Sequence, residues 1–323
     1  MVETFFLMLL LVTAFLTIQQ RRLRTSVIFM AVFSLLSSVV FLLYQAPDVA
    51  MAEIVIGSTL STVLYLVALS KQERLSQVMH LPKIPRPQMR IQVILQRLPA
   101  AILTVLAAVL LIWLYPPAAD LAGQDIAADW YRSRFQSDTG AGNAVAAIYL
   151  NYRVYDTLFE TLTLLISVLG VVHLSRYAEE PLPASLPVPG RMTRNGHDDG
   201  QIITPLLRLL LPLVMLTGFY IMFYGHLSPG GGFQGGAILS SVLFLRYLTV
   251  QENDLRLALM QKLEKILFLL IILVPALIVF ITPFDLSGWM KSLYLITMNL
   301  LIGVKVCFGL SVIFIRFVFH ESR

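Results

Sequence analysis

The chain is constrained above all by the recurrence of apolar runs long enough to cross a lipid bilayer. A membrane-spanning helix needs about 20 mostly apolar residues. We place such runs near 4–19, 25–44, 49–70, 98–115, 153–174, 205–224, 236–250, 265–281 and 293–315, of which the seventh is short. Only 13% of the residues are charged, too few to cover the surface of a soluble domain of this size. The sequence therefore predicts an all-α, polytopic integral membrane protein with about nine transmembrane helices.

The distribution of lysine and arginine predicts the orientation of these helices. Cytoplasmic loops carry an excess of basic residues. With the N-terminus outside, the inner segments hold 18 of the 24 basic residues, and they are 20–24, 71–97, 175–203, 246–265 and the C-terminal tail. The sequence thus predicts an N-terminus outside and a C-terminus inside. The net charge of +5 reflects this topology, so nothing supports a nucleic-acid partner.

Two polar, proline-rich stretches at 71–97 and 177–203 have the composition of cytoplasmic linkers. They divide the chain into a three-helix module at 1–70, a two-helix module at 98–176 and a four-helix module at 204–323. We see no internal repeat among these modules. The odd helix count argues against a transporter built from inverted repeats.

An acidic segment on the predicted outer side, 116–142, connects the two helices of the middle module. Around 125–135 its pattern fits a short amphipathic helix, with Trp130 and Tyr131 at the depth of the lipid headgroups. An ordered loop packed on a partner is the alternative interpretation.

Two carboxylates lie near the start of the third span, where charged groups are costly and are therefore functional candidates. Asp48 follows Pro47 and suits the first turn of a helix, so helix capping explains it adequately. Glu53 lies more than one turn deeper, where capping no longer applies. We interpret Glu53 as part of an ion path, with a structural hydrogen bond to a neighbouring helix as the alternative.

The fifth span begins with a second pair of carboxylates. Asp156 and Glu160 are four residues apart and share one helix face. Such a pair can relay protons or coordinate a small cation, because close carboxylates repel and tend to retain a proton. Arg153 precedes Asp156 by three residues and can neutralise it. We therefore favour a structural role for Asp156 with Arg153 and an ion-path role for Glu160.

A lysine, Lys305, lies near the middle of the last span, with Asn299 on a roughly similar face. A buried lysine shifts its pKa readily and can exchange protons. The alternative is a lysine held by a carboxylate from another module. A single cysteine, Cys307, and five scattered histidines provide no ligand set for zinc, haem or an iron–sulfur cluster. We therefore expect no cofactor, and no metal beyond transient Na⁺ at the carboxylates.

A glycine-rich stretch at 225–236 holds six of the chain's 18 glycines. Its distinctive residues are Gly225, His226, Pro229, Gly230, Gly231 and Gly232. Glycine permits backbone angles that other residues avoid, and irregular backbone at membrane depth is tolerated only inside protein or beside a wet cavity. Gly232 and Gly236 also form a Gly-x-x-x-Gly pair that favours close helix contact.

Three motifs together resemble a known family. Gly225-His226-x-x-Pro229-Gly230-Gly231-Gly232-Phe233-x-Gly235-Gly236 resembles the B subunit of Mrp-type multisubunit Na⁺/H⁺ antiporters. Ala46-Pro47-Asp48-Val49-Ala50, followed by Glu53, resembles the region near the C-terminus of the large A subunit. Asn143-x-Val145 and Tyr152-Arg153-x-Tyr155-Asp156-Thr157-Leu158-x-Glu160 resemble the two helices that follow it. The same modules resemble three small membrane subunits of gas-evolving hydrogenases.

The resemblance implies a subunit of a larger assembly in a prokaryotic inner membrane, with Na⁺ and H⁺ as its ions. It implies ion-path roles for Glu53, Asp156 and Glu160, and family positions for the glycine loop. The long antiporter-like domain of the A subunit is absent from this chain, so we expect it in a separate partner. We weigh three hypotheses: an outward-facing ion path in an antiporter, a membrane-arm subunit of a redox-driven complex, and a structural adaptor without an ion path.

Overall fold

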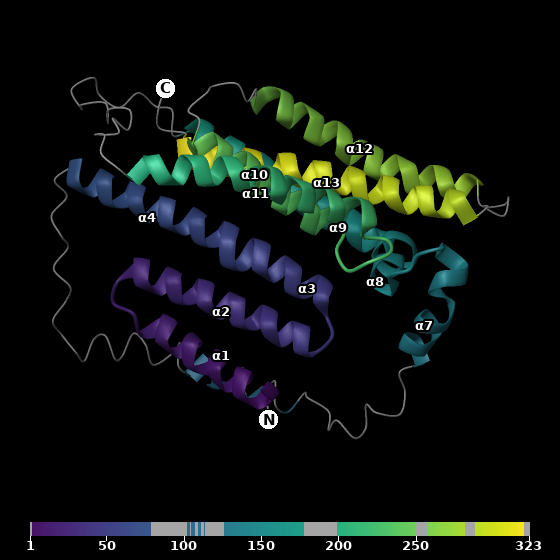
Figure 1. Ribbon diagram of the computed structural model, residues 1–323, viewed down its shortest axis with the longest axis horizontal. Coiled ribbons are helices and arrows are strands. Elements are labelled where there is room, and N and C mark those ends of the chain that lie inside the picture. The colour runs from purple at the N-terminus through teal and green to yellow at the C-terminus, as the bar shows by residue number, and fades with distance from the viewer. Residues whose placement is uncertain are drawn as a thin grey trace. The chain divides into compact units, whose positions relative to one another are not determined.

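The computed structural model describes residues 2–78, 126–177, 199–249, 257–281 and 288–319, together with scattered residues between 102 and 113. Throughout these residues the regular structure is helical (Figure 1). The chain divides into two compact units, Met1–Lys71 with Phe135–Arg323, and Gln72–Arg134. The candidate site described below lies within the first unit.

The N-terminal helices follow one another as the sequence predicts. They are α1 (Val2–Gln19), α2 (Leu23–Leu43), α3 (Pro47–Ala52), the π-helical η1 (Glu53–Leu60) and α4 (Ser61–Val78). Gln45 has a φ of 56°, and Pro47 occupies the first turn of α3, so the chain stops and restarts between α2 and α3. The last helix continues to Val78, whereas we expected it to end near residue 70.

In the middle of the chain, a helix forms at the segment where we expected a short amphipathic helix. Two further short helices follow it that we did not expect. These elements are α7 (Ile126–Thr139), α8 (Ala144–Ala147), the π-helical η2 (Ile148–Tyr152) and α9 (Val154–Tyr177). Asn143 starts α8, because its side-chain oxygen accepts a hydrogen bond from the Val145 N–H at 2.9 Å. Of the span expected at 98–115 only scattered residues are described, and these are helical; the others lie outside the described residues.

The C-terminal helices pack around the last of them. They are α10 (Asp199–Tyr224), α11 (Gly232–Thr249), α12 (Leu257–Ile281) and α13 (Gly288–Phe319). Helix α13 packs against α9, α10, α11 and α12, and buries Leu295, Met298, Ile302 and Val306. A Cβ on Gly236 would meet the backbone of Gly303, so the close helix contact that the Gly-x-x-x-Gly pair predicts is confirmed between α11 and α13.

Helix α12 corrects one boundary. We expected its span at 265–281 and assigned 246–265 to a basic inner connection, but the helix begins at Leu257. Glu264 therefore lies on a helix, where it is buried with Met260 and Ile271. Our expectation was wrong because the charged residues around Glu264 have the composition of a linker. They nevertheless lie on a helix that has one buried face and one exposed face.

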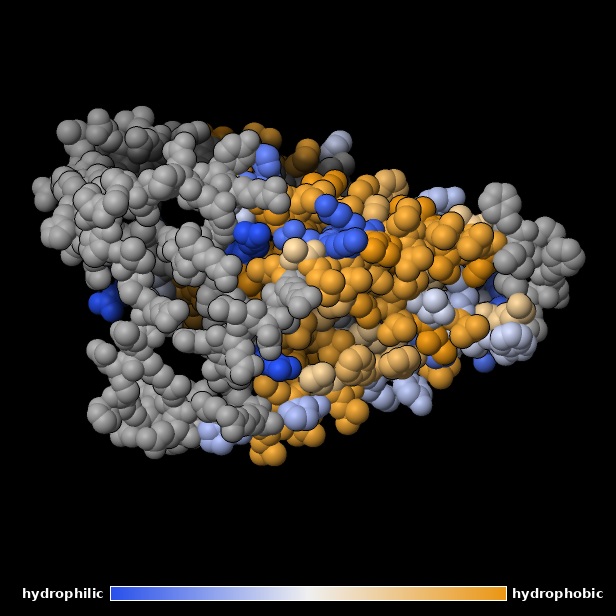
Figure 2. Space-filling view, turned by 90° about the horizontal axis from the view of Figure 1, so that it is seen from above, coloured by the Kyte–Doolittle hydropathy of each residue, from blue (hydrophilic) through white to orange (hydrophobic). Residues whose placement is uncertain are grey.

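Five helices among the described residues are long and apolar enough to cross a membrane. They are Val2–Gln19, Leu23–Leu43, Pro47–Ser70, Val154–Ser175 and Gly288–Phe317, and Leu209–Tyr224 is a shorter apolar helix. Hydrophobic residues also cover much of the described surface seen in Figure 2. Such surface suits contact with lipid or with other membrane subunits. The chain is a multi-pass membrane protein, while the count of nine spans and the orientation stay predictions.

Candidate functional site

The glycine loop, residues 225–231, is the point at which the three modules meet. Asp48 of α3 accepts a hydrogen bond from the Gly230 N–H at 2.5 Å. The carbonyl oxygen of His226 accepts hydrogen bonds from the N–H groups of Gly142 and Asn143, at 2.9 and 3.1 Å. The Asn143 side chain donates to the Ser228 carbonyl at 3.1 Å. Backbone polar groups of the loop are thus satisfied by the other two modules.

Asn299 of α13 holds the start of α11, which directly follows this loop, through a hydrogen bond. Its Oδ1 accepts hydrogen bonds from the Gly232 N–H and from the Tyr149 hydroxyl, both at 3.0 Å. Tyr149 lies in η2, and its carbonyl accepts the Thr157 hydroxyl of α9 at 2.6 Å. Because Asn299 is fully buried, these bonds tie α13, α11 and η2 into one polar joint.

Two glycines of the loop need to be glycine. Gly230 and Gly231 have φ angles of 131° and 156°, which other residues rarely adopt. A Cβ on Gly231 would also meet the hydroxyl of Tyr149. His226 beside them is buried, with Nδ1 at 3.0 Å from the Phe223 carbonyl, and burial lowers the pKa of this histidine. The imidazole is therefore neutral at neutral pH.

Glu53 lies at the start of η1 and is held by a neighbouring helix. Its carboxylate accepts a hydrogen bond from the Ser34 hydroxyl of α2. A Cβ on Gly57 would meet both of these side chains, so the glycine leaves room for their contact. This bond corresponds to the structural alternative that we gave for Glu53. An ion-path role for Glu53 stays a prediction.

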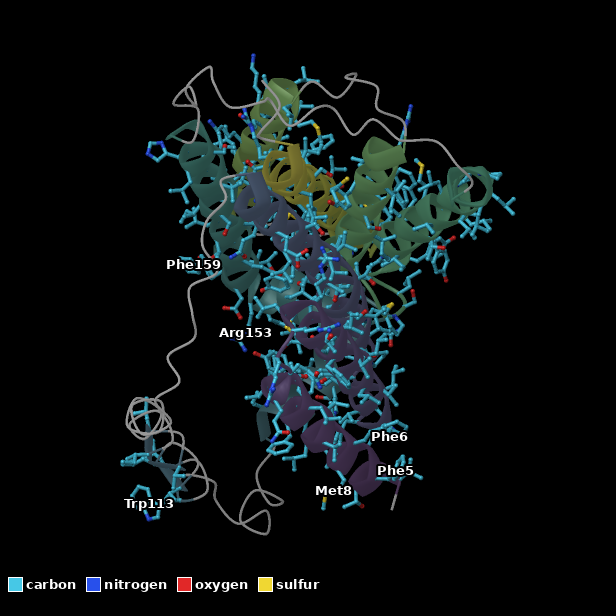
Figure 3. All side chains as sticks on the ribbon, turned by 90° about the vertical axis from the view of Figure 1, so that its left-hand side faces the viewer. Phe5, Phe6, Met8, Trp113, Arg153 and Phe159 are labelled. Atoms are coloured by element: carbon cyan, nitrogen blue, oxygen red, sulfur yellow. The ribbon has the colours of Figure 1, made fainter. Side chains whose placement is uncertain are left out.

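Asp156 pairs with Arg153, as the spacing of three residues suggests. The carboxylate and guanidinium groups are 2.6 Å apart, and their side chains are 57% and 61% exposed. Arg153 immediately precedes α9, and Figure 3 labels it together with Phe159 of that helix. An exposed ion pair contributes little to stability, about 0–1 kcal/mol. Its effect here is to neutralise Asp156 and to leave Glu160 as the uncompensated carboxylate on this face.

Helix α9 carries a line of polar side chains on its surface, which we call the polar stripe: Asp156, Glu160, Thr163 and Ser167. All four side chains are exposed, and their spacing of four, three and four residues places them on one helix face. The stripe extends about 16 Å along the helix at 1.5 Å per residue. The hydroxyls of Thr163 and Ser167 donate to carbonyl groups one turn earlier, both at 2.9 Å.

Lys305 lies behind the stripe and is fully buried. Its Nζ donates to the Thr161 carbonyl of α9 at 2.6 Å and lies 3.0 Å from Oε1 of Glu264 on α12. Lys305 is also close enough to Glu160 for their charges to interact. Our alternative for Lys305 named a carboxylate from another module. The carboxylate, Glu264, instead belongs to the same four-helix module.

Sequence reasoning missed three residues of this region: Ser34, Tyr149 and Glu264. Glu264 had a detectable signal, because it falls on the same helix face as Met260 and Ile271, whereas Lys262 and Lys265 do not. Tyr149 and Ser34 had none, since their partners are distant in the sequence. Among the described residues the predicted path residues do not form one cluster: Glu53 bonds to α2, Asp156 to Arg153 and Lys305 to Glu264.

Two protein families match parts of the chain. Residues 8–74 match the MbhD family, which is described as a subunit of MBH, and residues 202–319 match the domain related to the MnhB subunit of Na⁺/H⁺ antiporter. The chain joins an MbhD domain to an MnhB-related domain. This arrangement confirms the resemblance to the C-terminal part of an Mrp-type A subunit fused to a B subunit.

Relatives and solved structures agree with this assignment. The chain is 30% identical over 155 residues to a Staphylococcus aureus (strain MRSA252) protein described as antiporter subunit mnhA2, covering 48% of this chain and 18% of that protein. It is also 30% identical over 119 residues to the uncharacterized protein MJ1307 of Methanocaldococcus jannaschii, covering 35% of this chain and 45% of that one. The chain thus spans less than half the length of these relatives.

The fold matches the structure of an Mrp complex from Dietzia sp. DQ12-45-1b, with a TM-score of 0.72 and 19% identity over 99% of this chain and 35% of that chain. A chain of the membrane-bound sulfane sulfur reductase, an archaeal respiratory membrane complex, matches with a TM-score of 0.50 and 29% identity over 68% of this chain and 96% of that chain. Both matching chains come from larger complexes. The matches show a shared helical fold, and the sequence comparisons relate the chain to antiporter subunits.

Proposed function

We propose that this chain is a membrane subunit of a cation/proton antiporter complex in a prokaryotic inner membrane, and that the polar stripe of α9 lines a path for Na⁺ and H⁺. The observation that supports the proposal most is the exposure of Glu160 on a membrane-spanning helix. A charged group facing hydrocarbon costs about 2.5–3.5 kcal/mol on insertion scales. A carboxylate at this position therefore requires either a wet cavity or a polar partner.

A second membrane subunit laid over the stripe would provide both. It would exclude lipid from Glu160, Thr163 and Ser167 and would enclose water between the two surfaces. Hard cations take oxygen ligands, and this face offers a carboxylate and two hydroxyl oxygens. Because Arg153 neutralises Asp156, Glu160 is the group at which Na⁺ and H⁺ would compete. A large antiporter-like subunit is a suitable partner.

Replacing Glu160 with Gln in the assembled complex tests the proposal. Glutamine keeps the size of the side chain and removes its charge, so we expect Na⁺-driven proton exchange in everted membrane vesicles to fall at least tenfold, with normal assembly. Asp129→Asn is the control, since it removes one exposed carboxylate that belongs to α7 and not to α9. Unchanged exchange in Glu160→Gln would remove Glu160 from the path. Loss of assembly with normal exchange in the remaining complexes would favour the adaptor role.

A redox-driven parent complex is the second candidate, favoured by the match of residues 8–74 to an MBH subunit and by the likeness to a respiratory membrane complex. In that case electron transfer in other subunits would drive the same ion path. Mass spectrometry of the purified complex separates the two candidates. Co-purifying subunits with redox centres would favour the redox-driven complex, and antiporter subunits alone would favour the antiporter.

A further inference from the structure

The ion pair of Lys305 and Glu264 joins three helices in the interior. The two side chains are 0% and 1% exposed, and their charged atoms are 3.0 Å apart. Lys305 also donates to the carbonyl of Thr161, the residue that follows Glu160. The ammonium group is thus held between α12 and α9, directly behind the polar stripe. A pair this deeply buried is weak evidence for a stabilising role, because desolvation of the charges offsets their attraction.

The charges of this region do not balance. Glu264 contacts the ammonium group of Lys305, and Glu160 lies close enough for its charge to act on the same group, so the three groups carry one net negative charge when all are ionised. The other basic residues of α12 nearby, Lys262 and Lys265, are exposed. Uncompensated charge is unfavourable in a medium of low dielectric constant, so one monovalent cation is needed to complete the set.

We propose that Glu264 is a positioning residue that occupies Lys305 and so prevents the lysine from neutralising Glu160. Glu264 is enclosed and in direct contact with Lys305, whereas the Glu160 side chain reaches the surface of the chain. The cation that completes the set therefore binds at Glu160. Glu264 in this way determines that Glu160 takes one exchangeable cation, either H⁺ or Na⁺. The inference rests on the ion-path role proposed for Glu160.

Two variants of the full complex test the role of Glu264. In Glu264→Gln, Lys305 loses the carboxylate of Glu264 and neutralises Glu160 instead. We expect the apparent KM for Na⁺ in everted vesicles to rise about tenfold or more, since a nearby positive charge no longer paired with Glu264 weakens cation binding at Glu160 by at least that factor. In the double variant Glu264→Gln with Lys305→Gln, the interior is uncharged and Glu160 again lacks a counter-ion. We expect this second substitution to return the KM to within about threefold of the wild type.

Recovery in the double variant is the result that a structural role or a proton relay through Lys305 would not produce. An assembled double variant whose KM for Na⁺ stays raised would overturn the proposal, and so would a Glu264→Gln variant with an unchanged KM. If Glu264→Gln does not assemble, the double variant decides alone by the same criterion. The Glu160→Gln result keeps the two claims apart. When Glu160→Gln abolishes exchange and Glu264→Gln changes nothing, only the role of Glu264 fails.

Discussion

The charged side chains of the predicted spans occupy three different environments. Asp48 is buried and accepts a hydrogen bond from the glycine loop, whereas Asp156 is exposed and paired with Arg153. Lys305 is buried with Glu264. Within the described part of the chain, only Glu160 combines membrane depth, exposure and a lysine that is already occupied. The environment of each group, more than its presence in a span, therefore identifies the functional candidate.

Asp48 should matter for stability. Replacing it with Ala removes the acceptor of the buried Gly230 N–H and of the Asn143 side chain. An unsatisfied buried donor costs about 1–3 kcal/mol, so we expect a lower Tm of the purified complex. Asp48→Asn keeps one acceptor oxygen and should lose less. Val49→Ala on the exposed side of α3 is the control. An Asp48→Ala complex with the same Tm as this control would refute the assignment.

The sequence identified the charged residues of the site better than it identified the residues that bond to them. Hydropathy located Glu53, Glu160 and Lys305 inside spans because single charges are conspicuous in apolar runs. It did not find Glu264, because neighbouring lysines made its segment look like a linker. The hydrogen bond of Glu53 to Ser34 and the joint between Asn299 and Tyr149 depend on packing between helices. Such contacts are set by tertiary structure and leave no local pattern.

At the scale of elements, α9 has one exposed face that carries polar residues and one buried apolar face. Its inner face packs Val168 and Val172 against Met260 of α12 and Val312 of α13. Its outer face combines the polar stripe with exposed apolar residues such as Phe159 and Ile166. The helices were predicted well where a long apolar run ends at Pro47 or at the glycine loop. The short elements α8 and η2 were missed because their apolar run, 144–150, is far shorter than a membrane span.

Cysteine scanning of α9 tests whether the stripe is wet in the assembled complex. We expect Thr163→Cys and Ser167→Cys to react with a membrane-impermeant, positively charged thiol reagent, and Na⁺ to slow the reaction. Ile166→Cys is the matched control, since this residue is exposed on the chain but lies beside the stripe among apolar residues. The native Cys307 is buried and should give a low background. Equal labelling of all three positions, or of none, would argue against a water-filled path.

At the scale of the whole molecule, the three modules are joined at the glycine loop and by Lys305, while the polar stripe remains exposed. The loop binds Asp48 from the first module and Asn143 from the second. Lys305 of the third module binds the Thr161 carbonyl of the second. Within the described residues, these contacts leave the polar stripe of α9 uncovered. We expect the stripe to be covered by another membrane subunit, because an exposed carboxylate does not suit lipid.

Equilibrium binding of ²²Na⁺ to the purified complex tests the central claim most directly. Wild-type complex and Glu160→Gln complex are compared at saturating Na⁺ and at a pH that keeps carboxylates ionised. The account predicts that the Glu160→Gln complex binds one Na⁺ fewer, because the carboxylate that takes the exchangeable cation is gone. Equal binding by the two complexes would contradict it.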